Sequence, residues 1–333
     1  MHRMKASIPI LSYRSISPVC GISPDEFRTQ LEWLRDHGWQ CIPLSQAVDY
    51  VKGRADVPEK AYALTFEDAY LDHWVHAAPL LREFGLKAAF TCVTAFLHDG
   101  PCRPDSTTPG ADLRSLPMSR DAWSLATDRN DPSGFMNRFE LRILAEEQGH
   151  ELIGGTHTRQ ACFVSDRATE RRSPSEAGAS HVAEADAQED SPMYPTGSAY
   201  AHDGYWQAGD EPFGQPLVRR KTEERIEFCL REFLLCRERL EEITGQPSRV
   251  MAWPWGEFDE VAVEMAALAG YEAALSFQRG PNDPTTHPYA MCRIRMQGGE
   301  TVRELGRRMR TASSPTLSRM FRRRTGWVPL AKV

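Results

Sequence analysis

The stretch Tyr62-Ala-Leu-Thr-Phe-Glu-Asp-Ala-Tyr70 is the point from which the fold is predicted. Its first five residues are mostly apolar and indicate a short buried strand, which ends in two adjacent carboxylates, Glu67 and Asp68. Catalytic groups are commonly mounted where a strand ends at the rim of a barrel or sheet. Adjacent residues that leave a strand can point in different directions, so one carboxylate could bind a metal ion while the other handles a proton. The alternative is a strand followed by an acidic helix start.

The composition is typical of a soluble globular protein. The chain has 333 residues, of which 41% are hydrophobic and 26% charged, with a net charge of −6, so it can form one large domain or two ordinary ones. This balance gives no reason to expect nucleic-acid binding, and no apolar run of about 18 residues predicts a membrane span. We expect a cytoplasmic protein, because the N-terminus shows no secretory cleavage site. The eight cysteines form no CxxC pair, which fits a reducing compartment, although their even number leaves disulfides open.

Strands and helices are predicted to alternate along the chain. Helix starts and stops are clear in places: Ser23-Pro-Asp-Glu26 combines a cap, a first-turn proline and acids, and Gly245 ends a long amphipathic helix over 222–244. Alternation of this kind implies a parallel sheet or barrel with right-handed crossovers. The expected strands lie at 7–13, 40–43, 62–66, 87–93, 150–154, 249–253, 272–277 and 290–296.

Two insertions and a basic end interrupt this pattern. Residues 98–133 are rich in loops, and residues 165–214 are polar and expected to be partly disordered, with four aromatic residues in 193–206 that could dock on the body. We therefore predict a domain over 1–312 and a basic tail over 313–333. Eight arginines between 303 and 324 indicate a solvated helix face, and weak contact with an anionic membrane surface is the alternative.

Unusual residues follow three of the predicted strands. They are Thr65-Phe-Glu-Asp-Ala-Tyr70, Gly149-His-Glu-Leu-Ile-Gly-Gly-Thr-His-Thr158 and Trp253-Pro-Trp-Gly256. In order and spacing these motifs resemble those of the polysaccharide deacetylases, the NodB-homology proteins of carbohydrate esterase family 4, and in particular the branch that acts on poly-N-acetylglucosamine. The residues 9–13 and 292–296 also look like that branch. The resemblance covers the chain from residue 9 to about 309, apart from the insertions.

The resemblance implies an α/β fold, a distorted (β/α) barrel of the NodB-homology type with two loop insertions. It also implies a metal-dependent hydrolase that removes N-acetyl or related acyl groups from an amino sugar of a polysaccharide or glycan precursor. By analogy, Asp68 and His157 would bind a divalent metal, most often zinc, which polarises the acyl carbonyl and activates water. Glu67 would be the general base, and Arg293 would orient the carboxylates. The substrate-binding residues implied are Tyr70, Trp253 and Trp255.

Several positions depart from the family pattern. The base is normally Asp, and Glu67 is one methylene longer, which changes its reach. The second metal histidine is replaced by Ala161 or Cys162; the Cys162 thiolate could bind zinc, or the cysteine could be inert core. His202 in the insertion is another source of a ligand. Arg14 stands where a histidine is usual and would weaken cation binding unless it faces a carboxylate. The alternative function is therefore a catalytically inactive barrel that binds a glycan or a protein partner.

Overall fold

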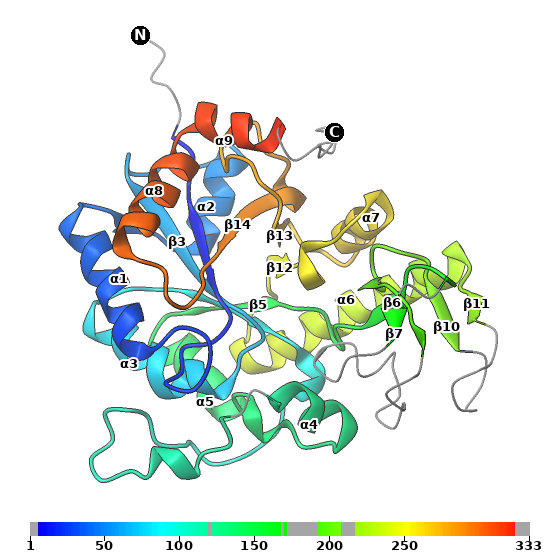
Figure 1. Cartoon of the computed structure of the whole chain (residues 1–333), viewed down its shortest axis with the longest axis horizontal. Coiled ribbons are helices and arrows are strands. Elements are labelled where there is room, and N and C mark those ends of the chain that lie inside the picture. The colour runs from blue at the N-terminus through cyan, green and yellow to red at the C-terminus, as the bar shows by residue number, and fades with distance from the viewer. Residues whose placement is uncertain (1–5, 119–120, 168–169, 172–191, 208–216, 324–333) are drawn as a thin grey trace.

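Seven parallel strands close into a barrel in the computed structural model, which describes residues 6–118, 121–167, 170–171, 192–207 and 217–323. Strand β3 pairs with both β4 and β1, and the pairing with β1 closes the ring (Figure 1). The short β2 (Gln40–Cys41) pairs with the start of β3 outside the ring. The predicted barrel is confirmed. Its strands in spatial order are β1 (Ile10–Tyr13), β14 (Met291–Arg295), β13 (Ala273–Ser276), β12 (Val250–Ala252), β5 (Glu151–Gly154), β4 (Ala89–Cys92) and β3 (Ala61–Phe66).

Helices surround the barrel (Figure 1). The first begins at a capping box in which Ser23 and Glu26 exchange hydrogen bonds, and the longest ends at Gly245 in the left-handed conformation, with φ of 68°. Among the described residues no helix is both long and apolar enough to cross a membrane. The helices are α1 (Pro24–Asp36), α2 (Leu44–Val51), α3 (Ala78–Glu83), α5 (Arg138–Arg142), α6 (Thr222–Thr244), α7 (Glu260–Leu268) and α8 (Val302–Ser313), with π-helical turns at His73–Ala77 and Ile143–Glu147.

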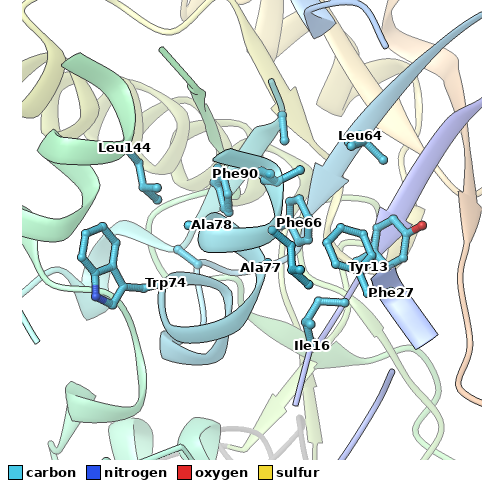
Figure 2. Close-up of a cluster of buried hydrophobic side chains, with 14 of the residues drawn as sticks. Tyr13, Ile16, Phe27, Leu64, Phe66, Trp74, Ala77, Ala78, Phe90 and Leu144 are labelled. Carbon is cyan, nitrogen blue, oxygen red and sulfur yellow. The ribbon is translucent and has the colours of Figure 1, made fainter. Parts of the chain in front are cut away.

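Each barrel strand directs every second side chain into the barrel interior and the others toward the surrounding helices. Successive side chains alternate between the two faces. Large aromatic side chains such as Tyr13, Phe66 and Phe90 pack outward with Phe27 of α1, and the Phe66 and Phe90 rings stack at 4.9 Å (Figure 2). The interior set is aliphatic and mostly small: Ile10, Ala61, Ala63, Ala89, Ile153, Val250, Ala252, Ala273, Leu275 and Met291.

Helix α2 closes the end of the barrel where the strands begin. We call this the lower end, although it is drawn uppermost in Figure 1. Its first two backbone N–H groups, of Leu44 and Ser45, donate to the Glu151 carboxylate at 2.7 and 3.0 Å. Leu44 and other apolar side chains of α2 continue the interior cluster. The opposite end, where the strands end, is the upper end, and two of its inward positions hold the polar side chains of Ser12 and Thr91.

The insertions contain more structure than the sequence predicts. The first includes α4 (Ala122–Asp128), whose Trp123 packs against Phe96 and Phe135. In the second, Tyr200 is fully buried against α6, so the expected docking of 193–206 is found. Much of the segment expected to be disordered, 172–191 and 208–216, lies outside the described residues. The remaining strands form an antiparallel sheet, β11 (Leu217–Arg219), β10 (Tyr205–Gln207), β6 (Ala161–Phe163) and β9 (Thr196–Ser198), and a separate pair, β7 (Glu170–Arg171) and β8 (Pro192–Met193).

The basic end of the chain is helical where it is described. Helix α9 (Pro315–Arg323) follows α8 directly, within the segment expected to be a tail. Arg319 of α9 forms an ion pair with Asp283, a buried residue of the loop before β14. The chain from Pro315 to Arg323 is thus attached to the barrel, and residues 324–333 lie outside the described residues.

Candidate active site

The upper end of the barrel encloses a cavity of about 10 Å³. The strand ends predicted to meet there do meet, because residues that follow β3, β5 and β12 line this one cavity together with side chains of β4 and β14. Five of the predicted site residues line this cavity, and all five are charged or aromatic. The lining residues are Glu67, Asp68, Thr91, Gly155, Arg159, Ala252, Trp253, Pro254, Trp255, Phe277 and Arg293.

Glu67 is a buried carboxylate that the site holds in its charged form. Its Oε1 accepts a hydrogen bond of 2.9 Å from the Ser12 hydroxyl of β1. Burial alone would raise the pKa of Glu67, but the charges of Arg293 and then Arg159 outweigh burial and lower that pKa. Glu67 can therefore accept a proton at neutral pH.

Asp68 faces a guanidinium. Its Oδ2 lies 3.1 Å from Arg159 Nη1, and both side chains are largely buried. The contact joins opposite charges without hydrogen-bond geometry, so Asp68 Oδ2 remains a buried acceptor with no hydrogen-bond partner. Burial raises the pKa of Asp68, Arg159 opposes that rise, and the neighbouring charge of Glu67 adds to it. The two adjacent carboxylates therefore have pKa values displaced in opposite directions.

Arg159 is the site residue that the sequence analysis missed. Its guanidinium lies over the rings of Trp123 and Trp255, at 5.0 and 4.9 Å from their centres. Its backbone N–H donates to the Thr156 hydroxyl at 2.9 Å, which fixes the turn after β5. The only signal in the sequence is its place two residues after His157, and arginine at such a position is usually a surface residue.

Backbone strain is concentrated at this end of the barrel. Six non-glycine residues in the described part of the chain have positive φ, and five of them lie in the three loops at the site. Non-glycine residues in this region cost free energy and persist where the surrounding structure holds them, often at functional sites. The five are Asp68 (62°), Ala69 (53°), Thr156 (70°), Arg159 (52°) and Trp255 (54°).

His157 and Cys162 do not line the cavity. The Nδ1 atom of His157 is 2.9 Å from the Thr94 hydroxyl, and burial lowers its pKa while the nearby charge of Glu232 on α6 opposes this. Cys162 is fully buried in β6, within the cluster that holds Tyr200, and burial raises the pKa of its thiol to about 11. At neutral pH this thiol is protonated, which suits a core residue.

The donor set therefore does not fit the divalent metal that the resemblance implies. Asp68 is already in contact with a cation, and Cys162 is a protonated thiol in another apolar cluster. In the described ranges no group of three or more His, Cys, Asp or Glu side chains is arranged to hold a metal ion. His202, the other candidate ligand, lies 3.4 Å from Glu257 instead.

The aromatic residues expected to bind substrate have different environments. Trp253 is 1% exposed, and its indole N–H donates to the Tyr289 carbonyl at 2.8 Å. It is therefore a core residue that also lines the cavity. Trp255 is only partly buried and covers the Arg159 guanidinium. Tyr70 stacks on Phe135 with ring centres 5.0 Å apart and lines a second, larger cavity.

The second cavity has a volume of about 230 Å³, and one of its lining residues, Tyr70, follows Asp68 of the first cavity by two positions. Arg14, Ser15 and Asp72 line it together with Tyr70. The charge of Arg14 acts on Asp68, so Arg14 connects the two cavities electrostatically. The histidine-to-arginine departure thus adds a cation beside a carboxylate.

Arg293 is placed as the sequence predicts, inside the barrel near both carboxylates. It is 6% exposed, and burial lowers the pKa of its guanidinium to about 10, against the opposing charges of Glu67 and Asp68. Its Nε and Nη1 atoms are buried and make no hydrogen bond within the protein. These donors are available to a molecule in the cavity.

Comparison with known proteins supports the resemblance drawn from the motifs. No family model matches the chain. A segment of 85 residues is 34% identical to the polysaccharide deacetylase-type protein YxkH of Bacillus subtilis strain 168, covering 25% of this chain and 30% of that protein. A segment of 70 residues is 33% identical to the poly-β-1,6-N-acetyl-D-glucosamine N-deacetylase of Escherichia coli K12, covering 21% of this chain and 10% of that protein. The chain thus matches less than a third of the length of these relatives.

Solved structures share the fold over almost the whole chain. A de-N-acetylase from Aggregatibacter actinomycetemcomitans aligns with a TM-score of 0.61 at 17% identity, covering 90% of this chain and 98% of that one. IcaB from Ammonifex degensii aligns with a TM-score of 0.61 at 15% identity, covering 93% and 99%. At these identities the structures establish the barrel fold, and the local sequence matches establish the similarity to polysaccharide deacetylases.

Proposed function

We propose that the protein is a hydrolase of the polysaccharide deacetylase type, which removes an acyl group from the nitrogen of an amino sugar in a polysaccharide or glycan precursor. Two independent features support this proposal. The segments similar to deacetylases and the barrel shared with them agree on the class of protein. The upper end of the barrel also carries a buried charged carboxylate, which can act as the general base in the hydrolysis of an amide.

The single observation that carries the proposal is the small cavity beside Glu67. A cavity of about 10 Å³ is close to the space that one water molecule needs. Buried polar atoms without hydrogen-bond partners belong to three of its lining residues: Asp68 Oδ2, Thr91 Oγ1, and Nε and Nη1 of Arg293. A water in this cavity would meet two to four polar partners, as buried waters do, and would be next to a proton acceptor.

The reaction follows from this arrangement. Water adds to the acyl carbon while Glu67 accepts the proton that the water loses. The carbon–nitrogen bond of the resulting tetrahedral intermediate then breaks, and the proton held by Glu67 passes to the departing nitrogen. The products are a carboxylic acid and a free amine, and Glu67 is again a carboxylate.

The substrate would bind over the small cavity, because that cavity holds no more than a water. Trp255 is a partly buried aromatic side chain at the small cavity, and aromatic faces suit the apolar faces of sugar rings. The larger cavity lined by Tyr70 and Arg14 has room for part of a sugar. We therefore expect the sugar to lie across Trp255 and Tyr70 with its acyl group toward Glu67.

Acetate release from N-acetylglucosamine oligomers tests the proposal. Glu67→Gln keeps the size of the side chain and removes the proton acceptor, so turnover should fall by about 100- to 10,000-fold. Glu264→Gln, on an exposed position of α7, is the matched control and should release acetate at the wild-type rate. If wild type and Glu67→Gln release acetate equally slowly while the oligomers still bind, the barrel is an inactive glycan-binding protein and the proposal is wrong.

A further inference from the structure

The contact between Asp68 and Arg159 puts a protein cation beside the carboxylate that the resemblance assigns to a metal ion. Asp68 Oδ2 is 3.1 Å from Arg159 Nη1, and both side chains line the small cavity. Arg159 also contacts two aromatic rings, since the ring centres of Trp123 in α4 and Trp255 after β12 lie 5.0 and 4.9 Å from its guanidinium. A guanidinium held by an ion pair and two rings is a fixed part of the site.

The charges around Asp68 oppose the entry of a divalent ion. Asp68 and Glu67 carry the negative charges of the cavity, and Arg159, Arg293 and Arg14 all act on Asp68 as positive charges. Three cations against two carboxylates leave the site positive before any metal binds. A divalent ion at Asp68 would have to displace Arg159 from its rings and then remain beside Arg293.

We propose that the guanidinium of Arg159 takes the electrostatic role of the metal ion, so that Asp68 is closed to divalent cations and the site works without one. The part of this inference that concerns the reaction rests on the proposed function. The disagreement between the implied metal and the residues present has two sources in the chain, the loss of the second histidine at Ala161 or Cys162 and the arginine at position 159.

The guanidinium would act on the charge that forms when water adds to the acyl group. As the new carbon–oxygen bond forms, the electron pair of the carbonyl moves to its oxygen, and the proton of the water moves to Glu67. Arginine has five N–H donors, and Nη1 is the atom that faces Asp68. The remaining donors of Arg159 can bind the oxyanion, and they release it when the carbon–nitrogen bond breaks and the carbonyl reforms.

A zinc titration and an acetate assay on the full chain test this inference together. Protein purified with a chelator is titrated with zinc by calorimetry, and acetate release from N-acetylglucosamine oligomers is measured with and without EDTA. The wild type should show no saturable zinc binding and no loss of activity in EDTA. Arg159→Ala should lose about 100- to 1,000-fold in acetate release, while Arg159→Lys, which keeps the charge, should retain more activity than Arg159→Ala. Arg129→Ala, at an exposed position after α4, is the control and should behave as wild type.

Two outcomes separate this inference from the proposed function. Stoichiometric zinc binding that Asp68→Asn abolishes, or activity that EDTA removes and zinc restores, would overturn the inference and leave the hydrolase intact. If the wild type releases no acetate with either EDTA or zinc, the hydrolase and the part of Arg159 in its reaction are refuted. A zinc titration without a binding signal would in that case still support the inference that Asp68 binds no divalent cation. Thermal melting of Arg159→Lys shows whether a folded variant has been measured.

Discussion

At the lower end of the barrel Glu272 forms ion pairs with three cations, whereas at the upper end Asp68, Thr91 and Arg293 keep buried polar atoms without hydrogen-bond partners. The lower ion pairs join Glu272 to Lys52 at 2.7 Å, to Arg54 at 2.9 Å and to Arg249 at 2.8 Å. They lie near the surface, where water also solvates them, and they connect the start of β13 to α2 and β12.

The same strands thus carry a stabilising end and a functional end. Buried polar atoms without partners cost free energy, and so does the positive φ of Asp68, Arg159 and Trp255. The apolar interior between the two ends and the ion pairs of the lower end offset these costs. On the proposed function, charge at the upper end serves binding and chemistry, and charge at the lower end serves stability. A substitution at the lower end should therefore lower stability, whereas a substitution at the upper end should lower turnover or raise stability.

The largest effect on stability is expected from Asp72, which lies beyond β3 at the upper end. Its side chain is 6% exposed and accepts a hydrogen bond from Ser15, while its Oδ1 has no hydrogen-bond partner. Burial raises the pKa of Asp72 from 3.8 to about 7, so the folded protein binds this proton more tightly than the unfolded chain does. That contribution to stability is complete below about pH 4 and is lost as the pH rises to about 7.

Asp72→Asn removes this ionisation, so the variant should gain stability relative to wild type as the pH rises. The difference should grow between pH 4 and pH 7 to at most about 4 kcal/mol and then level off. Urea unfolding at pH 5 and pH 8 measures it, with Asp128→Asn at an exposed position as the control. A variant that is less stable than wild type at pH 8 would show that the charged form of Asp72 is needed in the folded protein.

A smaller effect, on turnover, is expected from Arg293. Arg293→Met keeps much of the side-chain volume but removes the cation that most lowers the pKa of Glu67. Acetate release should fall by about 100-fold, because the ionised form of Glu67 is less favoured without Arg293 and the cavity loses two hydrogen-bond donors. Arg295→Met is the comparison, since Arg295 also lies 4.1 Å from the Phe277 ring but is exposed and lowers the pKa of Glu67 less than Arg293 does. Equal losses in the two variants would mean that general positive charge, rather than Arg293, supports the site.

The smallest effect is expected at the lower end. Glu272→Gln removes the shared partner of Lys52, Arg54 and Arg249, and because these groups are partly solvated the loss of stability should be about 1 kcal/mol. Hydrogen bonds, first of all from Arg249, lower the pKa of Glu272, so this contribution is present at neutral pH and disappears as the pH falls below the usual range of a carboxylate. Acetate release should not change. A loss of turnover without a loss of stability would break the division between the two ends.

The alternation of strands and helices could be predicted from the sequence because caps, glycines and short apolar runs mark each element locally. Every expected barrel strand is found, and Glu67, Asp68, Trp253, Trp255 and Arg293 come together at one cavity. The role of Arg159 could not be predicted, since it depends on Trp123, which an insertion supplies from 36 positions earlier in the chain. The zinc that the resemblance implies is untested, and the donor set around Asp68 does not fit it. The cytoplasmic location and contact of the basic end with a membrane stay predictions.

The most direct test of this division measures acetate release and the free energy of unfolding on Glu67→Gln and Glu272→Gln side by side. Both variants replace one carboxylate by an amide, one at each end of the barrel. We expect Glu67→Gln to lose turnover by at least about 100-fold, and Glu272→Gln to lose about 1 kcal/mol of stability at unchanged turnover. If Glu67→Gln is the destabilised variant and keeps its turnover, the upper end is a structural charge cluster and the account is wrong.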